Sequence, residues 1–341
     1  MTRAQADSGS VVITGCGWVT PFAAGTIRDV LEQAANLQRP EVLDGGYWAV
    51  PEAIRQNYPG IPAELGRDRE GWIAAAALEA ARKSAALGDD DVNPERVGMV
   101  LGSAAAGQVG MMNFATEVRQ QSARFVSPIH FPQTVGNYVD GALARGYHIR
   151  GPHATLACGA ASSLEAMVEA AGVIRTKRAD VVYAGGVSAL TAELAQGVSG
   201  SGARHSEGAC VFVMESSVHA ASRGADVLAQ VTEPRGPRVD PAGVDIIVVE
   251  TTGCRVGQVA TEYWTGRCAG ALGAACAATA IGAVSGLPVP LWDDSAEGGV
   301  SITTLTPNNI QKADGTLSVR VCADDDRGHR ATLELTVALR G

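Results

Sequence analysis

The chain has 341 residues, of which 46% are hydrophobic and only 5% are aromatic. Its formal net charge of −9 argues against nucleic acid and anionic membranes as partners, because an acidic surface repels phosphate groups. The same charge repels an acidic protein partner unless basic residues gather in one place. A chain of this length can bury one large core or the cores of two fused halves.

Seven cysteines are scattered along the chain, and no pair has the CxxC spacing. This usage favours small buried side chains in a reducing compartment over a disulfide framework or a zinc site. The first ten residues contain no apolar run typical of a signal peptide, and glycines and charges interrupt the later apolar runs. We therefore expect a cytoplasmic protein that uses no metal and no cofactor.

Apolar, β-branched runs alternate with helical patterns in the first two thirds of the chain. The run at residues 11–14 predicts a buried strand that ends in a tight turn at Gly15-Cys16-Gly17. An alanine-rich helix is expected over residues 72–87, with Asp68 as its cap or first-turn acid. Further strands are predicted at residues 97–102, 154–158, 180–186 and 208–215, and further helices at residues 107–121 and 164–174.

A second set of elements follows. Strands are predicted at residues 227–231 and 245–249, a small-residue helix at 270–283, and two strands around a turn at 324–328. Alternating strands and helices indicate an α/β layered fold. We divide the chain into an N-terminal half, residues 1–225, and a shorter C-terminal half, residues 226–341, which read as two versions of one unit.

Four stretches of this sequence resemble the β-ketoacyl-acyl-carrier-protein synthases. They are VVITGCGWVTPFAAG (residues 11–25), the long stretch from Arg150 to Leu190, GACVFVMES (residues 208–216) and TGRCAGALGAA (residues 265–275). They occur in the family's order. The resemblance implies a thiolase-like fold, in which two βαβαβ-type halves form five αβαβα layers and the protein is a dimer.

The resemblance also identifies positions where catalytic residues are missing. Counting back from Ala179-Asp180-Val181 places Ala160 at the family's nucleophilic cysteine, with Cys158 two residues too early. A methyl group cannot take up an acyl chain. The two family histidines align near Thr251 and with Arg267, and the family lysine aligns at about Glu262. The resemblance therefore implies that this chain has no catalytic residues of its own.

A non-catalytic relative of this kind exists in type II polyketide synthases. The chain-length factor resembles its ketosynthase partner, lacks the cysteine and forms a heterodimer with it. The stretch from Ala160 to Ala166 is similar to that of the factors for aromatic polyketides, with Ala in place of their Gln. That change, and a trimmed segment between Val231 and Asp245, resemble the factors of highly reducing, polyene-making systems more closely.

The resemblance implies a function and a set of partners. We expect the chain to pair with a ketosynthase alpha subunit, to meet acyl-carrier protein through that complex, and to shape the tunnel for the polyketide acyl chain. Gly110, Met111, Phe114 and Ala115 lie on the helix that would meet the partner and bound the tunnel. A bulky side chain would end such a tunnel and a small one would extend it. The alternative interpretation is that these residues form ordinary interface core.

Two alternative functions remain open from the residues. Cys158 can be a displaced nucleophile of a self-sufficient acyltransferase or thiolase-like enzyme, or a buried cysteine at the end of a strand. The whole chain can also be an acyl-binding protein that takes no part in elongation. Asp324, Asp325 and Asp326 are expected to form a solvated turn rather than a metal site, because no other ligand cluster can be placed beside them.

Overall fold

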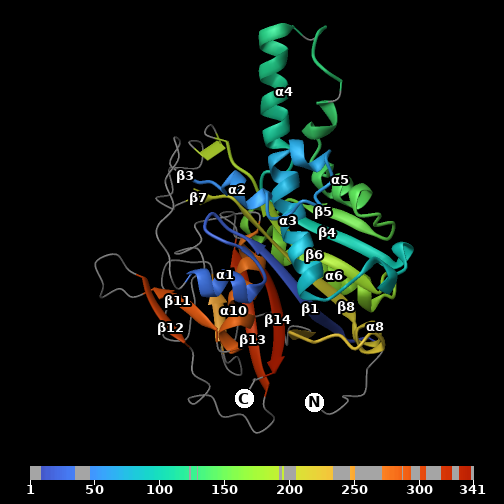
Figure 1. Cartoon of the computed structure of the whole chain (residues 1–341), viewed down its shortest axis with the longest axis vertical. Coiled ribbons are helices and arrows are strands. Elements are labelled where there is room, and N and C mark those ends of the chain that lie inside the picture. Colours follow the sequence, from blue (N-terminus) through green and yellow to red (C-terminus); the bar gives the residue numbers. More distant parts are fainter. Residues whose placement is uncertain are drawn as a thin grey trace.

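The computed structural model describes most of the N-terminal half and the main elements of the C-terminal half. The described residues are 9–34, 47–122, 124–128, 130–191, 194–195, 205–232, 246–249, 271–285, 287–292, 300–304, 316–324 and 330–338. The architecture is α/β, as predicted, with helices packed against a large mixed sheet (Figure 1).

Ten of the described strands form the main sheet. They are β1 (Val11–Val19), β2 (Ala24–Gly25), β4 (Val97–Ser103), β5 (His153–Leu156), β6 (Val181–Ser188), β8 (Gly208–Ser216), β9 (Ala229–Thr232), β10 (Ile246–Val249), β13 (Thr316–Asp324) and β14 (Arg330–Ala338). Their order is β10-β13-β14-β9-β1-β8-β6-β4-β5, with β2 paired to β1. Two small sheets pair β3 (Tyr47–Trp48) with β7 (His205–Ser206) and β11 (Pro288–Trp292) with β12 (Val300–Thr304).

The main sheet contains the same pairing pattern twice. In the N-terminal part β4 runs parallel to β6, while β6 and β8, and β8 and β1, are antiparallel. In the C-terminal part β10 runs parallel to β13, while β13 and β14, and β14 and β9, are antiparallel. Antiparallel pairing between β1 and β9 joins the two series. The chain thus contains two topologically equivalent series of strands; the boundary between residues 225 and 226 stays a prediction.

Helices lie on both sides of the N-terminal strands. The α-helices are α1 (Ile27–Ala34), α2 (Glu52–Arg55), α3 (Arg69–Ser84), α4 (Gln108–Gln121), α5 (Tyr138–Gly146), α6 (Ser162–Arg175), α8 (Ser217–Ser222) and α10 (Leu272–Val284). The short 3-10 helices are η1 (Leu65–Arg67), η2 (Asp89–Asp91), η3 (Pro94–Arg96), η4 (Phe131–Thr134) and η5 (Gly159–Ala161). Helices α6 and α10 contact each other and strands of both series, so they form a middle layer, whereas α3 and α5 cover the other face of the N-terminal strands.

Strand β8 shows how the two faces of the sheet are used. Phe212 and Met214 point into the core around α6 and α10, while Val211 and Val213 point into the core around α3 and α5. All four side chains are buried. Because side chains alternate along a strand, a strand buried on both faces reads as a continuous apolar run. This is the pattern that made residues 208–215 recognisable in the sequence.

The predicted turn at Gly15-Cys16-Gly17 is wrong, because β1 continues through it to Val19. The glycines are needed where helix α3 crosses the strand. A Cβ atom on Gly17 would lie 1.9 Å from the carbonyl oxygen of Ala77, and one on Gly15 would lie 2.5 Å from that of Ala81. Glycine therefore allows close packing of helix on strand here, rather than a change of chain direction.

Helix α3 begins as the sequence predicts. The Asp68 carboxylate accepts a hydrogen bond from the backbone N–H of Gly71 at 2.7 Å, which satisfies a donor of the first turn. Burial raises the pKa of Asp68, with this hydrogen bond acting in the opposite direction. The alanine-rich stretch that follows is buried almost throughout. Asp68 is thus a cap residue, one of the two alternatives that the sequence left open.

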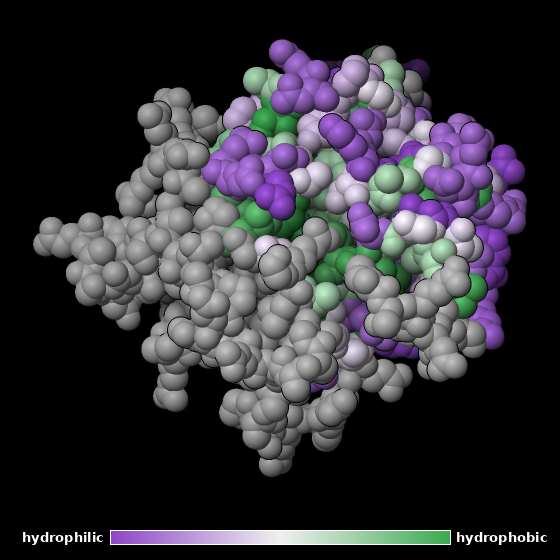
Figure 2. All heavy atoms as spheres, turned by 60° about the horizontal axis from the view of Figure 1, so that its bottom comes forward, coloured by the Kyte–Doolittle hydropathy of each residue, from purple (hydrophilic) through white to green (hydrophobic). Residues whose placement is uncertain are grey.

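Hydrophilic side chains predominate on the described part of the face in Figure 2, and hydrophobic ones gather toward its middle. No helix among the described residues combines the length and the apolar composition that a bilayer crossing requires.

Candidate functional site

The predicted nucleophile position lies at a strand-to-helix junction. Strand β5 ends at Leu156, the turn η5 follows, and α6 begins at Ser162. Ala160 is in this turn and only 5% exposed. Gly159 has a φ of +59°, a left-handed conformation that glycine adopts without strain. The structure therefore places Ala160 at the buried N-terminal end of α6, where a helix dipole would favour an anion, but with a methyl group as its side chain.

A serine hydroxyl fixes the shape of this turn. The backbone N–H of Cys158 donates to Oγ of Ser162 at 2.9 Å, and that hydroxyl donates to the carbonyl oxygen of Gly159 at 2.6 Å. Since the Cys158 amide is already used within the turn, it is not available to stabilise an oxyanion. The Cys158 side chain is partly buried and packs against the core around α6 and α10. Its position thus supports the interpretation as packing more than the one as a displaced nucleophile.

The junction is enclosed by close contacts with both series of strands. A Cβ atom on Gly102, at the end of β4, would lie 2.4 Å from the carbonyl carbon of Ser162. On the other side the N–H of Ala274 in α10 donates to Oγ of Ser163 at 3.0 Å. The turn η5 also contacts α10 and β13. The start of α6 therefore lies between the two halves of the molecule and is held by backbone packing and serine hydroxyls.

Several predicted positions lie outside the described residues. These are Thr251, Glu262, Arg267 and the turn residues after Asp324. The alignment of Thr251, Glu262 and Arg267 with the family's histidines and lysine therefore stays a prediction. The described residues contain no group of three or more His, Cys, Asp or Glu side chains that could hold a metal ion.

The second set of predicted residues lies on a projecting hairpin, which we define as residues 107–135. Helix α4 is its outgoing arm and η4 lies on its returning arm; the hairpin stands off the body at the top of Figure 1. The rings of Phe114 and Phe131 pack edge to face with centroids 5.8 Å apart. The Glu117 carboxylate lies 2.8 Å from Nδ1 of His130. These contacts hold the two arms together without any residue of α4 being buried.

Two predicted tunnel residues have different surroundings in this hairpin. A Cβ atom on Gly110 would lie 2.0 Å from the carbonyl oxygen of Gln133, so this glycine faces the returning arm. Met111 is instead 56% exposed. Within one chain, the hairpin residues and Ala160 have different surroundings: the hairpin projects from the body (Figure 1), whereas Ala160 is buried.

Two buried acids that the sequence did not reveal, Glu207 and Glu70, lie at the end of the sheet where β4 finishes and α6 starts. Glu207 accepts hydrogen bonds from Arg69 and from the backbone N–H groups of Val50 and Leu190. Glu70 accepts one from the hydroxyl of Ser103 at 2.5 Å. Burial raises the pKa of Glu70 to about 8, with that hydrogen bond opposing the shift. Both acids read in sequence as ordinary surface charges, because their partners lie far away along the chain.

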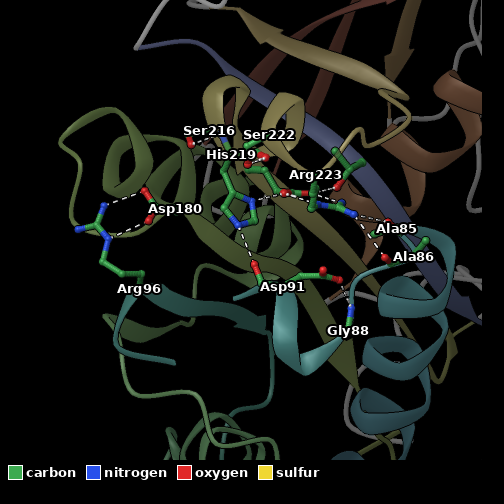
Figure 3. A network of polar contacts seen from close by, with 12 residues as sticks. Ala85, Ala86, Gly88, Asp91, Arg96, Asp180, Ser216, His219, Ser222 and Arg223 are labelled. Atoms are coloured by element: carbon green, nitrogen blue, oxygen red, sulfur yellow. Dashed lines mark hydrogen bonds and ion pairs between the residues drawn. The ribbon is translucent and has the colours of Figure 1, made fainter. Parts of the chain in front are cut away.

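A denser charge cluster lies at the opposite end of the sheet, around Glu215 (Figure 3). Its buried carboxylate accepts hydrogen bonds from Thr14, from Nδ1 of His219 at 2.6 Å and from Arg223 at 2.5 and 3.0 Å. Burial alone would raise the pKa of Glu215, but these hydrogen bonds outweigh it and hold the pKa at about 2. Arg223 also donates to the carbonyl oxygen of Ala85, so the cluster ties β8 to the end of α3.

The comparisons with known sequences point to one family. Residues 63–217 match the N-terminal domain of the β-ketoacyl synthases. A 3-oxoacyl-[acyl-carrier-protein] synthase 1 of Haemophilus influenzae is 26% identical over 182 residues, which cover 46% of this chain and 45% of the relative. A synthase 2 of Rhizobium meliloti is 24% identical over 273 residues, 65% of this chain and 62% of the relative. The chain thus spans about half to three fifths of these relatives.

The comparisons with solved structures support the fold over nearly the whole chain. A β-ketoacyl synthase from Burkholderia phymatum STM815 superposes with a TM-score of 0.75 at 18% identity, covering 97% of this chain and all of that one. The ishigamide ketosynthase/chain length factor gives a TM-score of 0.74 at 16% identity, covering 98% of this chain and all of that one. A type II polyketide synthase acyl-carrier protein in complex with its ketosynthase gives 0.74 at 15%, covering 97% and 100%.

Proposed function

This chain matches the β-ketoacyl synthases in part of its sequence and has a fold like theirs, and we propose that it is a non-catalytic chain-length factor. In this proposal it forms a heterodimer with an active ketosynthase and shapes the acyl tunnel in which that enzyme elongates a polyketide by decarboxylative condensation. The observation that carries the proposal is Ala160. Its methyl group lies buried at the start of α6, the position that the resemblance assigns to the nucleophilic cysteine.

The chemistry of the junction supports a subunit without its own nucleophile. Acyl transfer needs a group that can attack the thioester and donors that stabilise the resulting oxyanion. Ala160 offers no nucleophile, and the Cys158 amide donates to Ser162 instead of facing a substrate. The matched relatives are named as synthases, so the fold is suited to condensation once a partner provides the cysteine.

The surface of the chain offers a place for a partner. Strand β5 ends the described strand order and pairs on one side only, with β4. An unpaired strand edge exposes backbone donors and acceptors that can pair with another chain. Helix α5 packs against both β5 and η4, which links this edge to the base of the projecting hairpin. A partner that covered the edge would therefore come close to the hairpin.

The hairpin itself carries large apolar side chains that are exposed in the single chain. Met111 is 56% exposed, Phe125 71%, Phe131 59% and Val135 44%. An apolar surface of this kind next to an open strand edge is typical of obligate interfaces, which are large and hydrophobic. Among the structural neighbours, one is described as a ketosynthase with its chain length factor and another as a ketosynthase with an acyl-carrier protein. Both partners belong to the proposal for this chain.

One observation favours a second candidate function. Cys158 is partly exposed and lies only two residues before Ala160, in the same turn. If it accepted an acyl group, the chain would be an acyltransferase in its own right. An acyl-binding protein without an elongation partner is the third candidate, and it needs neither Cys158 nor a second subunit.

Intact-mass spectrometry separates these three candidates. The chain would be incubated with acyl-loaded carrier protein, alone and together with a ketosynthase encoded beside it. The proposal predicts a one-to-one complex that is labelled only on the partner's cysteine. Labelling of the isolated chain that disappears in the Cys158→Ala variant would make it an enzyme. If no complex forms and this chain is not labelled on its own, the chain-length factor is excluded and the acyl-binding candidate remains.

A further inference from the structure

A surface pocket that the proposed function does not use lies at the C-terminal end of α5. Its volume is about 440 Å³, within the range typical of small-molecule sites. The lining residues are Gly141, Ala144, Arg145, His148, Ile149, Arg150 and His153. Four of these seven side chains are arginines or histidines and none is acidic. On a chain with a net charge of −9, such a concentration is the opposite of the average surface.

Among the described residues, the carboxylates that the two guanidinium groups contact are distant and exposed. Arg145 lies 3.9 Å from Glu64, and Arg150 lies 3.8 Å from Glu95. All four side chains are at least half exposed, and pairs of this kind contribute little energy. A Cβ atom on Gly141 would lie 3.7 Å from a guanidinium nitrogen of Arg145, so this arginine folds back along α5 toward Gly141, which also lines the pocket. Both arginines therefore keep donors available for an anion.

His153 is held in a fixed orientation at the pocket. Its Nδ1 lies 2.7 Å from a carboxylate oxygen of Asp140, which is buried in α5. The other oxygen of Asp140 has no hydrogen-bond partner among the described residues, so the carboxylate acts on this imidazole alone. A buried carboxylate that binds Nδ1 leaves Nε2 as the nitrogen that a ligand can meet.

The backbone of His148 is in the left-handed conformation, which is energetically unfavourable for a residue with a side chain. Its φ is +55°, the left-handed region in which glycine is usual at the end of a helix. Non-glycine residues in this region are strained by about 1 kcal/mol or more, and Ala86 after α3 and Lys177 after α6 have the same conformation. The imidazole of His148 lines the pocket, so the strained position is also the one that adds a fourth basic group.

We propose that this pocket binds a small phosphate-bearing molecule through its phosphate group, which Arg145 and Arg150 hold from two sides with His148 and His153. Guanidinium groups match phosphate oxygens with paired N–H donors, and a doubly charged anion suits several converging cations better than a single carboxylate does. The helix dipole of α5 accounts for basic residues at its end, such as Arg145 and His148. It does not account for Arg150 and His153, which come from the segment that follows. His153 is also the first residue of β5, whose free edge the proposed partner would cover, so the inference concerns the chain without that partner.

Calorimetric titration at constant ionic strength tests the proposal. The probes are inorganic phosphate, glycerol 3-phosphate and, as the uncharged control, glycerol. The pocket variant is Arg145→Gln/Arg150→Gln. The matched variant, Arg119→Gln/Arg124→Gln, removes the same charge from exposed arginines of the hairpin. We expect saturable one-to-one binding of a phosphate probe that weakens at least about tenfold in the pocket variant only, the effect of losing hydrogen bonds to a charged group.

A His148→Gly variant adds a readout that a purely structural role would not give. It should raise the thermal midpoint by about 1–3 °C, because glycine relieves the left-handed strain, and yet weaken phosphate binding several-fold. Tighter binding of glycerol 3-phosphate than of phosphate would assign a phosphate ester as the ligand, and equal binding would assign the free anion. Absent or linear binding, or an equal loss in both double variants, would overturn the proposal.

Discussion

The two ends of the main sheet are stabilised in different ways. Near the start of β6, the buried Glu215 carboxylate accepts hydrogen bonds from His219, Arg223 and Thr14. Where β4 and β5 finish, the start of α6 is held by backbone contact with Gly102 and by serine hydroxyls. The first end depends on a charge cluster. At the second end the junction itself depends on shape, although the buried acids Glu207 and Glu70 lie at that end too. A packed junction of this kind can keep its form whether or not a reactive side chain is present, as the methyl group of Ala160 illustrates.

The largest effect is expected at the charged end. Glu215→Gln leaves Arg223 and His219 as partly buried cations without their buried counter-ion. Breaking a fully buried pair costs about 3–5 kcal/mol, so we expect a loss that approaches this range. Equilibrium urea unfolding would measure the loss. The matched variant is Asp180→Asn, which removes the partner of Arg96 in a half-exposed pair and should cost under about 1 kcal/mol. Similar losses in the two variants would show that the Glu215 cluster does not dominate this end.

A smaller effect is expected where packing dominates. A methyl group on Gly102 would meet the backbone of Ser162 and Ser163 at 2.4 to 2.6 Å, so Gly102→Ala should cost about 1–3 kcal/mol. Gly172→Ala, on the same α6 helix, meets nothing within 4 Å and should stabilise by up to about 1 kcal/mol. The difference between the two urea midpoints measures the packing. Stabilisation by both substitutions would contradict a tightly packed junction.

The charged end should also give the fold a characteristic pH dependence. The pKa of Glu215 is lowered from its ordinary 4.5 to about 2, so its contribution is present above pH 4.5 and is lost as the pH falls toward 2. The hydrogen bond to Glu215 raises the pKa of His219, so that contribution is complete below pH 6.5 and is lost as the pH rises through the raised value. Both contributions overlap between about pH 4.5 and 6.5.

Urea midpoints across pH 3–9 would test this dependence. Relative to the unmodified chain, His219→Gln should reduce the decline in stability on the alkaline side without removing it, because the raised pKa of Glu70 also lowers stability there. Glu215→Gln should reduce both the acid-side and the alkaline-side change. A pH profile that neither substitution alters would assign the dependence to other groups.

The smallest effect on the fold is expected in the hairpin, where the consequence should instead be functional. Ala115→Trp on α4 should change the free energy of unfolding by less than about 0.5 kcal/mol, because no residue of that helix is buried. In the complex with a ketosynthase it should shorten the products, whereas Thr116→Trp, an exposed neighbour, should not. Mass spectrometry of the products measures the difference; equal product lengths from the two variants would contradict the prediction. Gly110→Trp is a poor test, since it would push α4 away from Gln133.

Much of the fold could be predicted because its signals are local. Continuous apolar runs mark the strands buried on both faces, as at residues 208–215, and Asp68 before an alanine-rich stretch marks the start of α3. The path of β1 through Gly15 and Gly17 could not be predicted, since glycines at a tight turn and glycines under a crossing helix look alike in sequence. Only the position of α3 separates the two.

The features of the candidate site also differ in how far the sequence could predict them. The resemblance to the synthases assigns Ala160 to the nucleophile position, which stays a prediction; the structure shows Ala160 in the turn directly before α6. The Glu215 cluster could not be predicted, because Thr14 and Ala85 reach it from positions far away along the chain. Nor could the basic pocket, since Arg145, Arg150 and the histidines come together only through the end of α5. Thr251 and Arg267 lie outside the described residues and stay predictions.

The central claim is that this chain contributes no nucleophile. The most direct test is the condensation rate of the complex when it is assembled with the Cys158→Ala variant of this chain. The proposal predicts a rate within about twofold of the unmodified complex, and no detectable condensation when the partner's cysteine is replaced instead. A loss of a hundredfold or more on replacing Cys158, in a complex that still assembles, would contradict it.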